Sequence, residues 1–206
     1  MSAYLIADVR VVNRQKFDLA RAPIRAFLES HGGVYLAHGQ EPEVVQGGWH
    51  PQRMMLVEFP SRESVDGMFA TREFGEMRDT LVNMAMFDIV VVDGITASRY
   101  AGEHPAPVYA VSDMRIVNRA VFDDYRVQIH RAMREHQGRY LVLTDEPTTV
   151  AGNWTPPHLT IMEFPSRGVA IAAYTASRYQ EARERGNNAA MIDMVLLAGG
   201  PVVAAA

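Results

Sequence analysis

Two acidic side chains lie among apolar neighbours in segments that have the composition of β-strands. Asp8 lies in the run 4–12, and Glu58 lies near the end of the run 53–59. A carboxyl group in apolar surroundings has a raised pKa and is suited to proton transfer, so both acids are candidate bases. The alternative is structural: Asp8 bonds the backbone or Arg10, and Glu58 pairs with an arginine at a strand end.

Three further polar residues gather around the same strands. His38 follows a short apolar segment, and His50 and Arg53 precede the run that contains Glu58. An imidazole can relay protons at neutral pH, and a guanidinium can hold an anionic oxygen. The predicted catalytic set is therefore Asp8, His38, Arg53 and Glu58.

Other chemistries find little support in the residue types and spacings. Cysteine is absent, which removes disulfides, thiolate metal sites and thiol nucleophiles. The histidines show neither HxH nor HExxH spacing, so we expect no metal site. Ser61 and Ser166 follow prolines where helices should begin, and they read as helix caps, not as nucleophiles.

The elements that must position these residues occur twice along the chain. Residues 4–93 align with 109–198 at a constant offset of 105, without a gap and with about 32 identities in 90 positions. Tyr-Leu-Ile-Ala-Asp-Val-Arg-Val-Val-Asn-Arg is repeated as Tyr-Ala-Val-Ser-Asp-Met-Arg-Ile-Val-Asn-Arg, and Glu-Phe-Pro-Ser-Arg occurs in both halves. The chain is a tandem duplication. We expect a first unit at 1–94, a linker at 95–107, a second unit at 108–200 and a tail at 201–206.

Each unit has the pattern of a ferredoxin-like βαββαβ fold. In the first unit we predict strands at 4–12, 34–37 (extended after a turn by 43–47), 53–59 and 87–92, and helices from Asn13 to Gly32 and over 62–84. Pro23 falls inside the first helix, where it could produce a kink. Helices would cover one face of each sheet, so the other face must be buried. We therefore predict an α+β protein in which the two sheets face each other as one pseudo-two-fold α/β barrel.

The duplication extends the list of candidate site residues. Asp113 and Glu163 repeat Asp8 and Glu58, while Tyr4 and Arg10 share the interior face with Asp8. Trp49 and Trp154 occupy equivalent positions and could line a pocket or close the barrel as core. His38, His50 and Arg53 are replaced by Leu143, Thr155 and His158 in the second half. A polar residue present in one half alone indicates either an asymmetric pocket or surface drift. The predicted substrate-binding set is Tyr4, Arg10, Trp49, His50, Asp113, Trp154, His158 and Glu163.

The quoted motifs, together with Gly-Gly-Val-Tyr-Leu-Ala and Gly-Gly-Trp-His-Pro-Gln-Arg, resemble the domain-of-unknown-function 1330 (DUF1330) family over nearly the whole chain. The resemblance implies membership of the dimeric α/β-barrel superfamily. That superfamily includes cofactor-free monooxygenases, isomerases, polyketide cyclases, heme-degrading enzymes and ligand-binding regulators. Arg53 matches an arginine of the family pattern. His38 and Leu143 stand where the family has another arginine, and His158 stands at the position equivalent to Arg53.

Composition narrows the partners. A net charge of −4 offers no basic excess for nucleic acid, and no apolar run is long enough to cross a membrane. The first residues lack the apolar stretch of a signal peptide, so we expect a cytoplasmic protein. A homodimer of the fused barrel is left open.

Three functions remain after these exclusions. The leading expectation is an enzyme without a bound cofactor that carries out proton transfer (isomerisation, cyclisation or lyase action) on a small, partly apolar carbonyl or aromatic metabolite inside the barrel. Asp8 or Glu58 would be the base, His38 or His50 the proton relay and Arg53 the anion-holding group. The alternatives are a cofactor-free monooxygenase of aromatic polyketides and a non-catalytic ligand-binding or stress-associated protein.

Overall fold

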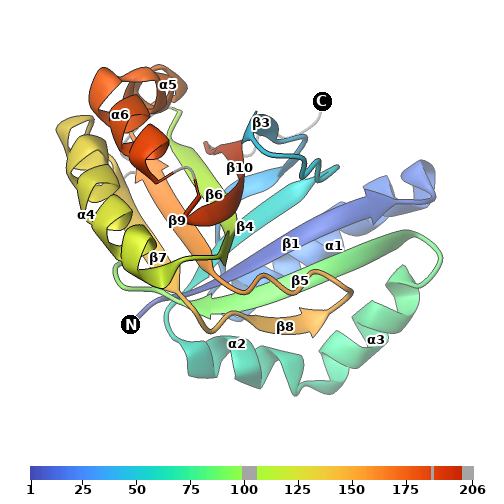
Figure 1. The fold of residues 1–206 in the computed structure, drawn as a ribbon. Coiled ribbons are helices and arrows are strands. Elements are labelled where there is room, and N and C mark those ends of the chain that lie inside the picture. The colour runs from blue at the N-terminus through green and yellow to red at the C-terminus, as the bar shows by residue number, and fades with distance from the viewer. Residues whose placement is uncertain (99–105, 187, 201–206) are drawn as a thin grey trace.

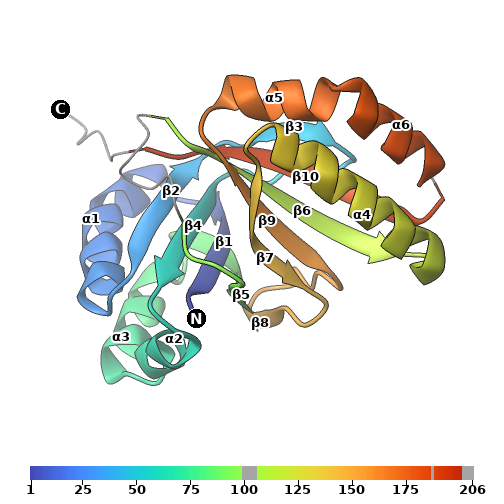
Figure 2. The ribbon, with the colours of Figure 1, turned by 90° about the vertical axis from the view of Figure 1, so that its left-hand side faces the viewer.

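Two five-stranded antiparallel sheets face each other, and helices cover the outer face of each (Figures 1 and 2). The structure is a computed structural model that describes residues 1–98, 106–186 and 188–200. The predicted tail at 201–206 and most of the linker lie outside the described residues. No helix in the described part of the chain is both long and apolar enough to span a bilayer.

The first half supplies five strands and three helices. These are β1 (Ala3–Val11), α1 (Arg14–Ser30), β2 (Val34–Gln40), β3 (Glu43–Gln46), β4 (Met54–Phe59), α2 (Arg62–Phe69), α3 (Arg72–Leu81) and β5 (Ala85–Asp93). Asn13 and Ser61 cap α1 and α2 by accepting hydrogen bonds from the main chain, as predicted. The single helix predicted over 62–84 is wrong: it is divided at Thr71, whose side chain caps α3. The helix α1 continues across Pro23.

The second half repeats this order. Its elements are β6 (Val108–Ile116), α4 (Arg119–Glu135), β7 (Arg139–Thr144), β8 (Thr148–Ala151), β9 (Leu159–Phe164), α5 (Arg167–Thr175), α6 (Ser177–Arg185) and β10 (Ala190–Ala198). Asn118 and Ser166 cap α4 and α5 as their counterparts do in the first half. The duplicated sequence therefore folds as a duplicated structure.

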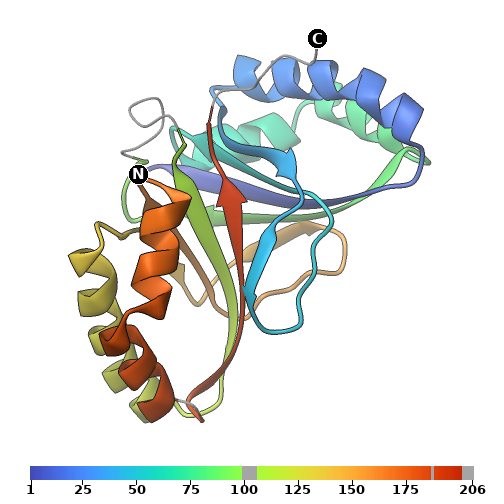
Figure 3. The same ribbon diagram turned by 90° about the horizontal axis from the view of Figure 1, so that it is seen from above.

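The halves exchange one short strand each, a feature absent from the prediction. The strand orders are β2-β4-β1-β5-β8 and β3-β10-β6-β9-β7, so β3 pairs with the second half and β8 with the first. Figure 3 shows β3 beside β10, and Figure 1 shows β8 beside β5. The predicted extension of the second strand by 43–47 is therefore wrong, because these residues join the other sheet. The two sheets face each other but do not close into a continuous barrel.

Three layers of apolar side chains hold the fold together. One core lies under the helices of each half, and a third fills the space between the sheets. The inter-sheet core takes alternate residues of the strands, including Tyr4 and Ile6 of β1 and Tyr109 and Val111 of β6, all fully buried. This alternation confirms the prediction that one strand face of each half is buried against the other half.

Candidate functional site

A pocket of about 470 Å³ lies between α1 and the outer face of the first sheet. Its apolar side chains come from β1, α1, β4 and β5. Its polar side chains come from α1, from β2 and from Arg53, the residue before β4. It is lined by Val9, Phe17, Asp18, Arg21, Ala22, Ile24, Arg25, Tyr35, His38, Gly39, Arg53, Met55 and Phe87. A largely apolar pocket of this volume with a few convergent polar groups is typical of small-molecule sites.

The pocket wall carries more positive than negative charge. Arg21, Arg25 and Arg53 face one acid, Asp18. Arg25 is engaged by Glu29, with 2.7 Å between Nε and Oε1. Within the described residues, the guanidinium groups of Arg21 and Arg53 make neither a hydrogen bond nor an ion pair. Two guanidinium groups are therefore available to an anionic ligand.

His38 sits in this wall as a neutral imidazole. Partial burial lowers its pKa, and the positive charges of Arg25 and Arg21 lower it further, against an opposing contribution from a hydrogen bond. That bond joins His38 Nε2 to the carbonyl oxygen of Gly200 at 2.8 Å. The ring also stacks on Tyr35, with centroids 5.3 Å apart. Because the pKa lies below the ordinary value of 6.5, the ring is mainly uncharged at pH 7.

The equivalent region of the second half is nearly closed, with a residual cavity of about 50 Å³. Tyr125 on α4 and Met114 on β6 stand where the first half has Ala20 and Val9. The arginines that are unpaired in the first half are either paired or replaced in the second half. Arg126, the counterpart of Arg21, lies 3.6 Å from Asp123. His158, the counterpart of Arg53, is 2% exposed and bonded through Nδ1 to Asp145.

One end of the inter-sheet core is closed by the two tryptophans. Trp49 and Trp154 have ring centroids 4.9 Å apart and pack against this core. Asp113 accepts a hydrogen bond from Trp154 Nε1 at 2.9 Å, and Asp8 accepts from the backbone of Gln52 at 3.2 Å. Burial raises the pKa of both carboxyl groups above the usual range. These residues act as an end wall of the core.

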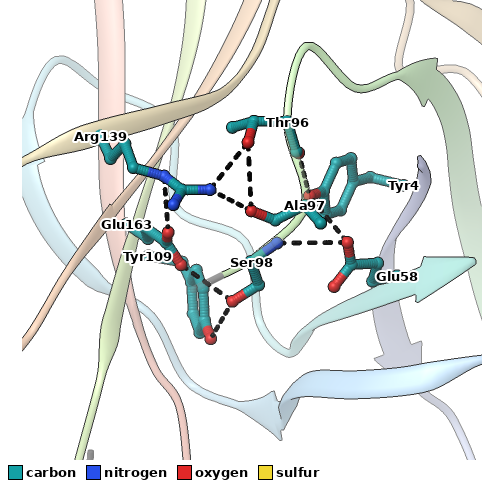
Figure 4. Close-up of polar contacts among 8 residues, drawn as sticks. All are labelled: Tyr4, Glu58, Thr96, Ala97, Ser98, Tyr109, Arg139 and Glu163. Atoms are coloured by element: carbon teal, nitrogen blue, oxygen red, sulfur yellow. Dashed lines mark hydrogen bonds and ion pairs between the residues drawn. The ribbon is translucent and has the colours of Figure 1, made fainter. Parts of the chain in front are cut away.

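The other end of the inter-sheet core holds the two glutamates, which the residues after β5 bridge (Figure 4). Ser98 donates its main-chain N–H to Glu58 at 3.2 Å and its hydroxyl to Glu163 at 2.8 Å. Glu163, fully buried, also pairs with Arg139, whose Nε lies 3.1 Å from Oε1.

Two tyrosines complete this end of the core. The hydroxyl of Tyr4 donates to Glu58 Oε1 at 3.1 Å, and the hydroxyl of Tyr109 lies 3.5 Å from that of Ser98. Burial raises the pKa of Tyr109 to about 12, so it stays neutral. Every one of these groups has a structural partner. Glu163 pairs with an arginine, whereas Glu58 is held by Tyr4 and Ser98 and not by the arginine that the structural alternative predicted.

The structure does not bring the four predicted catalytic residues together. His38 and Arg53 line the pocket beside α1, while Asp8 and Glu58 lie at opposite ends of the inter-sheet core. Asp8 reaches Arg53 only through that residue's main-chain nitrogen, at 3.5 Å. Apolar side chains occupy the space between the sheets, where we expected a ligand, whereas the pocket that holds His38 and Arg53 opens on the outer face of the first sheet.

The predicted substrate-binding residues are also dispersed. Arg10 pairs with Asp88 at 3.0 Å, and His50 is exposed. The remaining six, Tyr4, Trp49, Asp113, Trp154, His158 and Glu163, are engaged within the core or its ends, outside the pocket. No group of three or more potential metal ligands occurs within the described ranges.

Sequence reasoning missed four polar pocket residues, Asp18, Arg21, Arg25 and Tyr35. Arg21 and Tyr35 escaped notice because both halves carry them, as Arg126 and Tyr140 in the second. Position 25 differs from its counterpart, His130, and would have been found by extending the comparison of halves to the helix.

Comparison with solved structures supports the fold. A mutant chlorite dismutase from Candidatus Nitrospira defluvii superposes with a TM-score of 0.56 at 9% identity, covering 97% of this chain and 92% of that chain. A candidate monooxygenase from Fusobacterium nucleatum gives 0.55 at 8% identity, covering 97% and 94%. An anthrone oxidase-like protein gives 0.51 at 10% identity, covering 100% and 96%. At these identities the likeness concerns the fold alone.

Comparison of sequences gives the family. No curated protein matches the chain significantly. The profile of the domain of unknown function DUF1330 matches twice, over residues 2–95 and 107–200. The two matches coincide with the two halves of the duplication and account for nearly the whole chain. The chain therefore belongs to the DUF1330 family and carries two tandem copies of its domain.

Proposed function

We propose that the pocket beside α1 binds a small, partly apolar organic anion and that His38 acts there as a general base in proton transfer. The ligand class is a carboxylate with an aromatic or short aliphatic group and a carbonyl close to an acidic C–H bond. Isomerisation, cyclisation and lyase reactions all begin by removing such a proton. A cytoplasmic location remains part of the proposal.

The observation that supports this proposal most is the difference between the halves. Both halves share a fold, yet only the first combines a 470 Å³ pocket with two unpaired guanidinium groups among the described residues. A structural requirement of the fold would apply to both halves equally. The first half instead keeps charges that would be more stable if paired, which is typical of a binding site.

The apolar wall and the cations of the pocket would contact different parts of the ligand. Phe17, Met55 and Phe87 can cover an aromatic or aliphatic group, while Arg21 and Arg53 can hold its carboxylate or developing enolate. His38, uncharged at pH 7, can accept a proton. It replaces Asp8 and Glu58 as the proposed base because neither carboxylate reaches the pocket.

Binding is tested with phenylpyruvate and benzoate, using benzamide as the uncharged comparison, by isothermal calorimetry. We expect both acids to bind and benzamide to bind more weakly. Arg21→Met and Arg53→Met should each weaken binding of the acids about tenfold to a hundredfold, the loss typical of one charged hydrogen bond. Arg126→Met is the matched control, because it removes the counterpart of Arg21 from the closed half and should leave affinity unchanged.

Catalysis is tested separately by following exchange of the C3 protons of phenylpyruvate with D₂O by NMR. We expect exchange above the buffer rate in the native chain and its loss in His38→Gln, with benzoate affinity retained. Binding without exchange would instead assign the chain to the ligand-binding class. Oxygen consumption with a quinol-like aromatic would indicate a cofactor-free oxygenase. Absence of anion binding would contradict the proposal as a whole.

A further inference from the structure

One residue of the pocket in the first half, His38, is contacted by the end of the second half. We infer that the main-chain carbonyl of Gly200 fixes the tautomer of His38 and so acts as a positioning group for its unprotonated nitrogen. The value of this nitrogen as a base rests on the proposed function, whereas the tautomer itself does not.

The last strand of the second sheet reaches the first sheet just beyond its end. After β10 ends at Ala198, Gly199 forms an isolated antiparallel bridge with Ala37, the residue before His38. The N–H of Gly199 also donates to the carbonyl of Pro107 at 2.8 Å. These contacts hold the following carbonyl, that of Gly200, 2.8 Å from His38 Nε2.

Two glycines permit this approach. A Cβ at position 199 would lie 2.6 Å from the ring of Tyr109 and 3.0 Å from the carbonyl oxygen of Leu36, so a larger residue would displace the chain. Gly200 has a φ of +136°, a backbone conformation that L side chains rarely adopt. The close contact with His38 therefore depends on the absence of side chains at both positions.

The hydrogen bond determines where the proton of the ring lies. A carbonyl oxygen can only accept, so Nε2 must carry the hydrogen in the neutral ring. Nδ1 is then unprotonated and keeps the lone pair that a base requires. Stacking on Tyr35 and the bond to Gly200 hold the ring from two directions.

The arrangement exists on one side only. At an offset of 105, the second half has Leu143 in place of His38, and the first half has Ile95 in place of Gly200. The chain still makes the equivalent approach there, since Ile95 N donates to the carbonyl of Leu141 at 2.8 Å. Both halves therefore place the chain after the last strand next to the second strand of the other half. Only the first half has a histidine there, which the carbonyl of Gly200 contacts.

The test is NMR of the full chain without ligand, with the ring nitrogens of His38 assigned by comparison with His38→Gln. We expect a single neutral tautomer with the proton on Nε2 and a ring N–H signal protected from solvent exchange. Gly200→Ala should displace the carbonyl and speed exchange of this ring proton about tenfold, the factor that one ordinary hydrogen bond provides. Gly67→Ala is the control, because its Cβ would meet open space on α2.

The native chain tests the inference even if Gly200→Ala does not fold. A neutral ring protonated on Nδ1, or an even mixture of tautomers, would overturn it. So would a folded Gly200→Ala variant whose ring proton exchanges as slowly as the native one. Because these measurements use no ligand, a failure of anion binding would contradict the proposed function and leave this inference standing.

Discussion

Single residues show opposite electrostatic behaviour in different parts of the molecule. Asp8 and Asp113 lie at equivalent positions at one end of the inter-sheet core, and burial raises the pKa of both. Asp145 is different, because its hydrogen bond to His158 lowers its pKa. The charged forms of Asp8 and Asp113, whose pKa values are raised, therefore cost stability. The charged form of Asp145, whose pKa is lowered, contributes stability.

Asn in place of Asp8 or Asp113 should stabilise the fold at neutral pH. In the native chain each group binds its proton more tightly when folded, so stability falls as pH rises from the ordinary pKa of 3.8 through the raised folded value. An amide oxygen can still accept the bonds from Gln52 or Trp154. We expect Asp8→Asn and Asp113→Asn to raise the melting temperature at pH 7 by about 1–3 °C, which corresponds to less than 1 kcal/mol.

The pH dependence distinguishes this explanation from a general gain in packing. Calorimetric scans between pH 3 and 7 should show the advantage of both variants disappearing below the ordinary carboxyl pKa, where the native aspartates are protonated as well. A fall in melting temperature at pH 7 in both variants would show that the charged forms are stabilising.

The candidate site was predictable only in part at this scale. His38 and Arg53 could be found because each differs from its counterpart, Leu143 or His158. The position of Asp8 and Glu58 outside the pocket could not be predicted, because strand alternation gives the face of a sheet but not whether that face lines a cavity or a packed core. The sizes of the side chains on the element that faces a sheet decide whether a cavity forms. Ala20 on α1 and Tyr125 on α4 show this, because the cavity measures about 470 Å³ in the first half and about 50 Å³ in the second.

At the scale of elements, the exchanged strands depend on two tight turns. Gly47 and Gly152 have φ values of +85° and +81° and follow β3 and β8. The next residues donate main-chain N–H groups to Asp193 and Asp88 of the opposite half. A Cβ on either glycine would lie 2.1 Å from the Oδ1 atom of that aspartate.

Alanine at either turn should therefore weaken the contacts between the exchanged strand and the opposite half. We expect Gly47→Ala and Gly152→Ala each to lower the free energy of unfolding by at least about 1–3 kcal/mol, the usual cost of a non-glycine residue in this backbone region. Urea unfolding measures it. Gly48→Ala is the matched control, since nothing lies within 4 Å of its added Cβ. Equal stability of all three variants would contradict the role of these turns.

A second prediction for the elements concerns the helix that covers the pocket. Tyr125 on α4 contributes to the packing that leaves only about 50 Å³ in the second half. Ala20→Tyr places the same side chain at the equivalent position of α1, so we expect it to reduce benzoate affinity at least about tenfold while every charged residue remains. Ala20→Ser is the control. Unchanged affinity in a folded Ala20→Tyr variant would place the ligand elsewhere.

The sequence predicted most elements because their signals are local. Asn13, Ser61 and their counterparts cap helices, and alternation marks the strand faces. The exchange of β3 and β8 could not be predicted, because Glu43–Gln46 indicates a strand without indicating its partner. That partner is decided by contacts with Asp193 and β10, about 150 residues away in the chain.

The whole molecule depends on burial of two sheets against each other. Eight fully or nearly fully buried side chains from each half form the inter-sheet core. Burying an aliphatic or aromatic side chain stabilises a fold by about 1.5–3 kcal/mol. The set contributed by one half is therefore comparable to the entire stability of a typical domain, about 5–15 kcal/mol. Each half also lacks a sheet partner for its exchanged strand.

Separated halves should not persist as folded monomers. We expect chains 1–98 and 106–206, produced individually, either to remain unfolded or to associate through the exposed sheet face, as judged by circular dichroism and light scattering. The first half could pair with itself, since its β3 and β5 occupy the positions equivalent to β8 and β10. Mixing the two fragments should give a heterodimer and restore the protected ring N–H of His38, because only the second fragment carries Gly200. A cooperatively folded monomer of either fragment would show that the inter-sheet core is dispensable, and the requirement for both copies in one chain would then need another cause.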